Sequence, residues 1–200
     1  MRLFVALLPP EEALAEIAQA VRGRRGEWSE LRWVPEELWH VTLAFLGEVD
    51  EGLLGGLEVR LARAAARHAA VEVAFAGAGA FPSAGRANVF WVGMRGVVAD
   101  ERGRPLLSGL AGSVTAGAEK AGVGRGERRR FHPHLTLARC RQRTDLRALV
   151  EGMSGFAGRP WRAGTVHLMR SYLGRSVRYE SIAQWPIGGD LRDRTVADAD

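Results

Sequence analysis

Apolar residues recur along the chain with two different periods, which predict strands and helices in alternation. Residues 2–8 and 71–81 are short runs rich in Val, Leu, Phe and Ala that end at turn residues, as strands do. Residues 10–26 repeat apolar positions at helical spacing, after a proline and beside two glutamates that suit a helix N-terminus. Further strands are predicted at residues 31–34, 38–46, 87–94, 134–140, 163–173 and 177–187, and further helices at residues 51–69, 106–123 and 145–153.

The order of these segments is repeat-like. Each half of the chain has a helix, then a strand that carries His-x-Thr-x, then another helix, and no linker is long enough to separate independent domains. We therefore expect a single bilobal domain over residues 1–187, with two similar lobes that face each other across a shared cleft. Residues 188–200 contain almost no apolar side chains, which predicts a disordered tail.

Two stretches, "LWHVTLAFLG" (38–47) and "FHPHLTLARC" (131–140), place histidine inside an apolar strand pattern. Because side chains alternate between the faces of a strand, His40 and Thr42 share one face, and so do His134 and Thr136. The residues between them face a core. Thr is also a good strand former, but its pairing with His favours contact with phosphate. Two such faces across a cleft would surround one small volume with two imidazoles and two hydroxyls.

This set of side chains suits displacement at phosphorus. Imidazole titrates near pH 6.5, so one His can take a proton from the attacking oxygen while the other protonates the leaving oxygen. The Thr hydroxyls can hydrogen-bond the non-bridging phosphate oxygens. Neither motif has a carboxylate cluster or a zinc-ligand spacing beside it, so we expect no metal and no cofactor. The near-symmetric pattern does not decide which His is the acid.

The paired motifs resemble the two-histidine phosphoesterase superfamily, and within it the bacterial RNA 2',3'-cyclic phosphodiesterases, first named 2'-5' RNA ligases. The similarity includes "RLFVALLPPEE", "RWVPEELWHVTLAFLGEVDE" and "LMRSYLGRSVRYESIAQWPI" in the same order, and it covers about residues 2–187. It implies a duplicated, bilobal α+β fold with two antiparallel sheets around a central cleft and helices outside. It also implies hydrolysis of RNA 2',3'-cyclic ends to 2'-phosphomonoesters, with His40 as proton donor and His134 as proton acceptor.

The positive charge of the chain favours an anionic partner. The formal net charge is +5, and Arg carries nearly all of the positive charge. The run "RGERRR" (125–130) is by default a solvated loop, but its place directly before the second motif makes three of its arginines candidates for RNA contact. The sequence also leaves Tyr172 and Tyr179 as either base-stacking or packing residues. The candidate RNA-binding residues are Arg128, Arg129, Arg130, His132 and Tyr172.

Two further residues near the second motif have alternative interpretations. His132 is either a third catalytic His or, more simply, a loop residue beside the cleft. Arg139 lies five residues after His134, so regular alternation points it away from that side chain unless the strand bends.

The remaining features of the sequence indicate the compartment in which the protein acts. Cys140 is the single cysteine, so no intrachain disulfide forms and a reducing compartment fits. The first apolar run is too short for a signal peptide and leads into Pro9 and Pro10, and no stretch approaches the ~18 apolar residues of a membrane span. We expect a cytoplasmic monomer that acts on RNA with a 2',3'-cyclic phosphate end, with tRNA among the candidates. The alternatives are a small cyclic nucleotide substrate, 2'-5' ligation, and an RNA-end-binding module without turnover.

Overall fold

The computed structural model describes residues 1–96, 106–124, 131–174 and 176–188 as an antiparallel sheet flanked by helices. Its strands follow the order β7-β4-β5-β6-β3-β1-β8-β9, and β2 pairs with β6. The strands are β1 Arg2–Leu7, β2 Arg32–Trp33, β3 Val41–Glu48, β4 Val71–Phe81, β5 Ala87–Gly96, β6 His134–Thr144, β7 Trp161–Ala163, β8 Thr165–Tyr172 and β9 Arg178–Pro186. The helices are α1 Glu11–Glu27, α2 Leu54–Ala66, α3 Leu106–Lys120 and α4 Arg147–Gly152, with 3₁₀ turns at Glu36–Leu38, Glu51–Leu53 and Ala84–Arg86.

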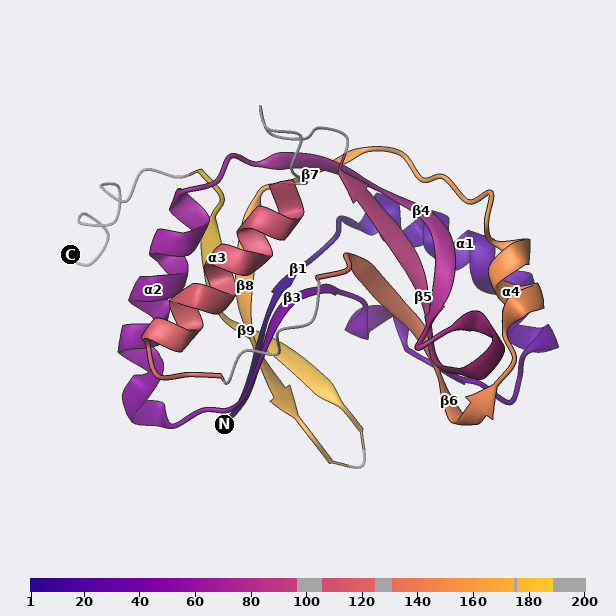
Figure 1. Ribbon diagram of the computed structural model, residues 1–200, viewed down its shortest axis with the longest axis horizontal. Helices are drawn as coiled ribbons and strands as arrows, with labels where there is room; N and C mark the ends of the chain where they lie inside the picture. Colours follow the sequence, from indigo (N-terminus) through magenta and orange to yellow (C-terminus); the bar gives the residue numbers. More distant parts are fainter. Residues whose placement is uncertain (97–105, 125–130, 175, 189–200) are drawn as a thin grey trace.

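The sheet divides into two halves that meet at one paired position. One half contains β7, β4, β5, β6 and β2, and the other contains β3, β1, β8 and β9. Between β3 and β6 the recorded pair is Val41 with Leu135. In Figure 1, α2 and α3 lie beside the half with β8 and β9, whereas α1 and α4 lie beside the half with β4 and β5. The predicted α+β fold with antiparallel strands and helices outside is confirmed, and the two predicted sheets are joined into one through the Val41–Leu135 pair.

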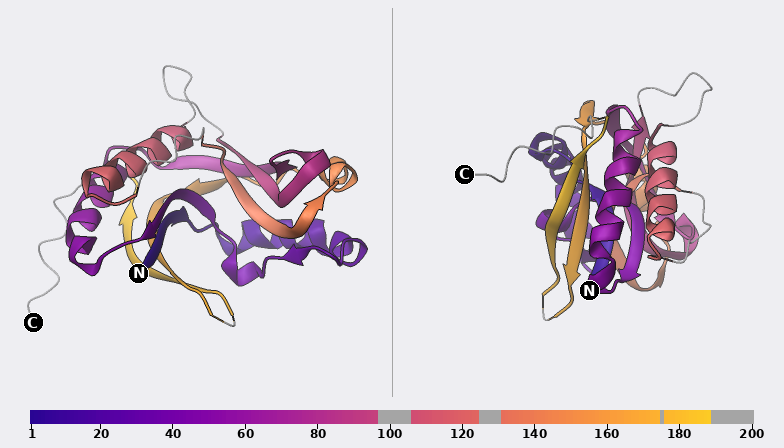
Figure 2. Two further views of the ribbon diagram at one scale, coloured as in Figure 1. Left: turned by 60° about the horizontal axis from the view of Figure 1, so that its bottom comes forward. Right: turned by 90° about the vertical axis from the view of Figure 1, so that its left-hand side faces the viewer.

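Helical periodicity explains how the outer layer attaches to the sheet. Helix α1 buries Ala13, Ile17 and Val21, which are spaced four residues apart and so lie on one side of the helix. Helix α2 buries Leu57 and Leu61 in the same way. Figure 2 shows α2 and α3 layered over their half of the sheet, with the β8–β9 hairpin extending beyond them. The helices therefore cover one face of the sheet and form the core with it.

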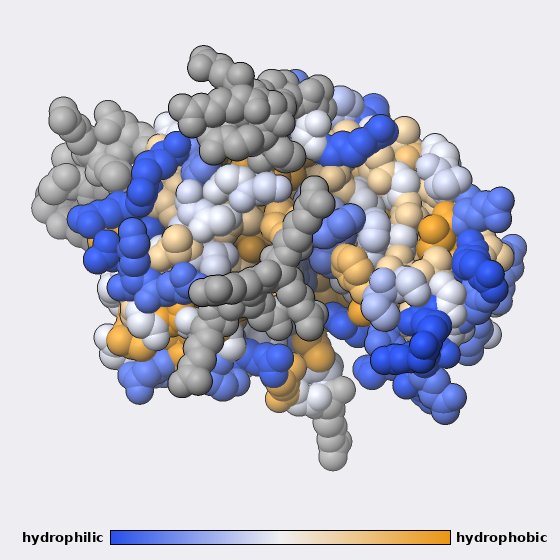
Figure 3. Space-filling model, viewed as in Figure 1, coloured by the Kyte–Doolittle hydropathy of each residue, from blue (hydrophilic) through white to orange (hydrophobic). Residues whose placement is uncertain are grey.

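The opposite face of the sheet is the one that carries the two His-x-Thr pairs, and we call it the histidine face. It has its own small apolar cluster of Phe4, Ala6 and Met169, separate from the main core and packed against Tyr179. On the side of the molecule seen in Figure 3, hydrophilic side chains gather along the outer edges of both halves, with paler and hydrophobic surface between them.

The structure departs from the sequence-based assignment in several places, and β6 continues to Thr144, beyond the strand predicted at residues 134–140. Strand β7 was not predicted, because three residues are too few to show an alternating pattern. The strand predicted at residues 38–46 begins only at Val41, after the Glu36–Leu38 turn, so His40 directly precedes the strand. In the predicted tail, Gly188 donates its N–H to the Ala65 carbonyl at 3.2 Å, and residues 189–200 lie outside the described part of the chain.

Candidate active site

The single pair between β3 and β6 brings the two motifs together. Val41 and Leu135 face each other and are fully buried, so the residues on either side of them lie on the histidine face. Extending this antiparallel register by one residue puts His40 opposite Thr136 and Thr42 opposite His134. Each imidazole therefore lies across from the hydroxyl of the other motif. The sequence predicted the members of this set, and the strand pairing gives the set its reciprocal arrangement.

Both imidazoles are held by the same backbone contact. The Nδ1 atom of His40 lies 2.7 Å from the Leu38 carbonyl oxygen, and that of His134 lies 2.7 Å from the His132 carbonyl oxygen. Because a carbonyl oxygen only accepts, Nδ1 carries the hydrogen in each bond. The Nε2 atom is then left to exchange a proton with a ligand, and the ring orientation is fixed.

Aromatic rings from other strands pack around each histidine. Phe4 of β1 and Tyr179 of β9 lie 4.7 Å and 5.2 Å from the His40 ring, measured between ring centroids. On the other half, Phe81 and Trp91 lie 5.0 Å and 5.9 Å from the His134 ring. These rings exclude water from one side of each imidazole and restrict its position.

Burial by these neighbours lowers the pKa of both histidines below the usual value. For His40, burial is the largest cause; the bond to the Leu38 carbonyl opposes it, and the positive charges of Arg139 and His134 add to it. For His134, burial again comes first; the bond to the His132 carbonyl opposes it, and the charges of the His132 ring and Arg139 add to it. Both imidazoles are therefore biased toward the neutral form until an anion arrives.

The regular alternation predicted for Arg139 does not hold, because β6 contains a bulge. The pairs with β5 run from Trp91–Thr136 to Phe90–Ala138, which leaves Leu137 without a partner of its own in that ladder. Leu137 and Ala138 are both fully buried, so the extra residue shifts the alternation by one. Arg139 therefore emerges on the histidine face, where its charge acts on both imidazoles.

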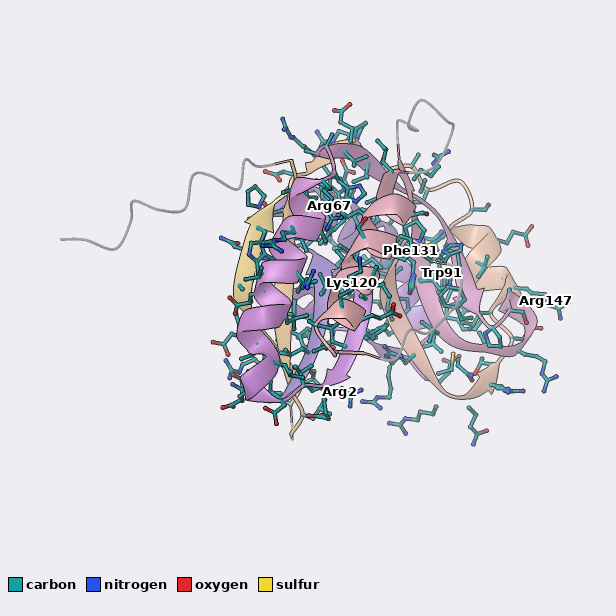
Figure 4. All side chains as sticks on the ribbon, turned by 60° about the vertical axis from the view of Figure 1, so that its left-hand side comes forward. Arg2, Arg67, Trp91, Lys120, Phe131 and Arg147 are labelled. Atoms are coloured by element: carbon teal, nitrogen blue, oxygen red, sulfur yellow. The ribbon has the colours of Figure 1, made fainter. Side chains whose placement is uncertain are left out.

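Trp91 is a second residue of this face whose place the sequence did not indicate. Its indole lies flat over Gly79 of β4, where a Cβ atom would come within 2.3 Å of the ring. Its ring centroid is 4.6 Å from that of His132. Figure 4 labels Trp91 among the strands, whereas the Arg147 side chain extends from the outer surface. Only the pairing of β5 with β6 reveals its position beside His134.

The other predicted RNA-binding residues are placed differently. His132 is exposed beside Trp91, and its backbone carbonyl orients His134. Tyr172 lies on the face opposite to Tyr179, with its hydroxyl donating to Glu180 at 2.5 Å and its ring covered by Arg170 and Arg178. The structure therefore brings Tyr179, and not Tyr172, to His40. Arg128, Arg129 and Arg130 lie outside the described residues.

Among the residues that the structure describes, no three His, Cys, Asp or Glu side chains gather into a group that could hold a metal ion. Nor does any described helix combine the length and the apolar character that crossing a membrane requires.

Comparison with known proteins connects this arrangement to a family of phosphoesterases. The model of the LigT-like phosphoesterase family matches residues 7–91 and 98–179. An RNA 2',3'-cyclic phosphodiesterase of Geobacillus stearothermophilus is 32% identical over 169 residues, which are 82% of this chain and 50% of that protein. The RNA 2',3'-cyclic phosphodiesterase of Archaeoglobus fulgidus is 34% identical over 143 residues, 72% of this chain and 74% of that protein. The matched region thus spans half of the Geobacillus protein and about three quarters of the Archaeoglobus one.

Solved structures show the same arrangement of strands and helices. A crystal structure from Thermus thermophilus superimposes with a TM-score of 0.71 at 27% identity, covering 95% of this chain and all of that one. The crystal structure of Escherichia coli LigT complexed with 3'-AMP gives a TM-score of 0.67 at 26% identity, covering 94% of this chain and 98% of that one. The similarity therefore extends over both halves of the sheet.

Proposed function

The chain belongs to the LigT-like phosphoesterase family, and from this premise we propose that it hydrolyses RNA 2',3'-cyclic phosphodiester ends to 2'-phosphomonoesters. The observation that carries the proposal is the Val41–Leu135 pair, which brings the strands of the two His-x-Thr motifs side by side. Both imidazoles use Nδ1 for a backbone bond and leave Nε2 for the substrate. An acid and a base with hydroxyls opposite them are the groups that in-line displacement at phosphorus needs.

In the proposed reaction, water attacks phosphorus and the bond to the ribose 3'-oxygen breaks. Neutral His134 takes a proton from the attacking water, and protonated His40 gives one to the leaving 3'-oxygen. The phosphate then remains on the 2'-oxygen, and the two histidines have exchanged protonation states. The assignment of His40 as donor and His134 as acceptor follows the family resemblance, since both rings present Nε2 in the same way.

The remaining polar groups support the developing negative charge. In the proposed reaction the hydroxyls of Thr42 and Thr136 donate to the non-bridging oxygens, and the Arg139 guanidinium supplies a positive charge that acts on both imidazoles. An anionic substrate raises the pKa of a nearby imidazole, which counteracts the effect of burial and protonates the acid. We propose that this set works without a metal ion.

We further propose that the protein is a cytoplasmic monomer and that tRNA is among its RNA substrates. A single cysteine, Cys140, fits a reducing compartment, because no intrachain disulfide is available.

The test is to incubate the protein, in EDTA, with nucleoside 2',3'-cyclic phosphates and with an oligonucleotide that ends in a cyclic phosphate. We expect a 2'-phosphate on both products, assigned by chromatography against the 2'- and 3'-phosphate standards. We expect His40→Ala and His134→Ala each to lower kcat by ~10²–10⁴-fold, the size of a general acid or base contribution.

His68→Ala is the matched control, because His68 bonds Ser113 at 2.8 Å on the helical layer and lies outside the site. Its turnover should match that of the unchanged protein. Three outcomes would contradict the proposal. The first is a 3'-phosphate product, and the second is activity that is lost in EDTA and restored by Mg²⁺ or Zn²⁺. The third is a variant of His40 or His134 that keeps more than about a third of kcat.

A further inference from the structure

Most of the charged residues that face each other across the sheet have opposite signs. Such side chains lie directly opposite on neighbouring strands, and their Cβ atoms are about 4.5–5.5 Å apart. In the described ladders the opposite-charge pairs are Arg2–Glu48, Glu72–Arg162 and Arg170–Glu180. The like-charged pair in these ladders is Arg32 of β2 with Arg139 of β6.

The two arginines lie on the histidine face. The next pair along the same ladder, Trp33 with Ala138, faces the core, so Arg32 and Arg139 face the other way. Both side chains are exposed, and neither forms an ion pair with a carboxylate among the described residues. Within the described part of the chain, two positive charges therefore stand next to each other without an ion-paired carboxylate.

Such a pair is unfavourable in the absence of a ligand, because like charges directly opposite each other destabilise a sheet. The same pair becomes favourable when a ligand brings negative charge between the two guanidinium groups, each of which can donate two parallel hydrogen bonds to a phosphate. The pattern is therefore typical of a binding surface for anions.

Arg32 lies well away from the two histidines that would hold the reacting phosphate. Position 139 lies five residues from His134, at most about 16 Å along the strand at ~3.3 Å per residue. Burial is the main cause of the lowered pKa of both histidines, and the positive charge of Arg139 adds to it across this distance. Arg32 lies one strand away from Arg139, beside β6, and its charge is not among those that shift either imidazole.

We propose that Arg32 binds the phosphodiester that precedes the cyclic phosphate end of an RNA chain, with Arg139 between that phosphodiester and the reacting phosphate. The inference rests on the proposed function and extends it, because it predicts a preference for oligonucleotides over mononucleotides. A nucleoside 2',3'-cyclic phosphate lacks the preceding phosphodiester and gains nothing from Arg32.

The test compares Arg32→Gln with the unchanged protein on a nucleoside 2',3'-cyclic phosphate and on an oligonucleotide with a cyclic phosphate end. For the oligonucleotide, kcat/KM should fall about tenfold, the size of one lost charge-assisted contact. For the mononucleotide the loss should be less than about twofold. The dependence of oligonucleotide binding on salt should flatten by a slope of roughly 0.7. The melting temperature of the ligand-free protein should rise, since the repulsion is removed.

Arg162→Gln is the matched control, because Arg162 is also an exposed arginine of the sheet but faces Glu72. It should change neither substrate preference nor salt slope, and its melting temperature should not rise. Equal losses on both substrates, an unchanged salt slope, or a lower melting temperature in Arg32→Gln would overturn the proposal. Equilibrium binding of the oligonucleotide is measured separately, so that the Arg32 inference is decided even if the unchanged protein hydrolyses neither substrate.

Discussion

Arg139 is the residue whose charge connects the two proposed catalytic histidines. Its positive charge disfavours the protonated form of each imidazole and adds to the effect of burial, so the pKa of both lies below its usual value. The acid and the base interact with each other as well, and the pH dependence of the reaction therefore belongs to the pair and not to either residue alone.

Arg139→Ala should therefore shift the pH profile of kcat/KM toward higher pH. Removing the positive charge raises the pKa of both imidazoles. The rise of kcat/KM on the acidic side, where the base loses its proton, therefore shifts to higher pH. The fall on the alkaline side, where the acid loses its proton, shifts in the same direction. Arg139→Lys keeps the charge and should keep the profile near that of the unchanged protein. The measurement is kcat/KM for a nucleoside 2',3'-cyclic phosphate from about pH 4 to 9. A profile for Arg139→Ala that stays in place would show that Arg139 acts only through contact with substrate.

At the scale of the element, the β4–β5 pair positions a ring beside the second motif. Strand β4 has Gly79 opposite Trp91 of β5, and the absence of a side chain there lets the indole lie flat on the neighbouring strand. From that position the ring reaches His132 and His134. One small residue on β4 thus affects a histidine on β6, two strands away.

We expect Gly79→Ala to lower both stability and turnover. The new Cβ would lie 2.3 Å from the indole, so the ring must move. Overpacking of this kind typically costs ~1–3 kcal/mol. Gly164→Ala is the control, because a Cβ there meets no atom within 4 Å. Thermal unfolding and kcat on a nucleoside 2',3'-cyclic phosphate measure the two effects. If Gly79→Ala keeps both its melting temperature and its kcat, the packing of Trp91 does not support His134.

At the scale of the whole molecule, two groups of arginines are the proposed contacts with RNA. Arg32 and Arg139 lie on the sheet, and the run at 125–130 leads into the strand that begins at His134. With a net charge of +5, the protein attracts an anionic polymer from a distance.

Neutralising Arg128, Arg129 and Arg130 together should lower kcat/KM for the oligonucleotide more than for the mononucleotide. An oligonucleotide presents phosphates beyond the reacting one, and each lost contact should flatten the salt dependence of binding by a slope of roughly 0.7. The chemical step should change little, because the proposed acid and base remain. The measurement is kcat/KM for both substrates at several salt concentrations. Equal losses of kcat/KM on both substrates, with an unchanged salt slope, would show that these arginines do not contact RNA.

The sequence by itself determined the α+β segments, the two His-x-Thr pairs and the face that each pair shares. These follow from local rules, because side chains alternate along a strand and recur every three to four residues along a helix. From this pattern the set His40, Thr42, His134 and Thr136 was predicted, although its catalytic role remains a proposal.

Only the tertiary structure decided which residues from separate strands lie together. The Val41–Leu135 pair places each His opposite the other motif's Thr, and the bulge at Leu137 and Ala138 turns Arg139 toward the histidines. Trp91 and Arg32 reach the same face through pairs between strands distant in the sequence. Tyr179 reaches it because the β8–β9 hairpin pairs with β1. Strand register and bulges arise from long-range packing, which no local pattern of hydrophobic and polar residues encodes.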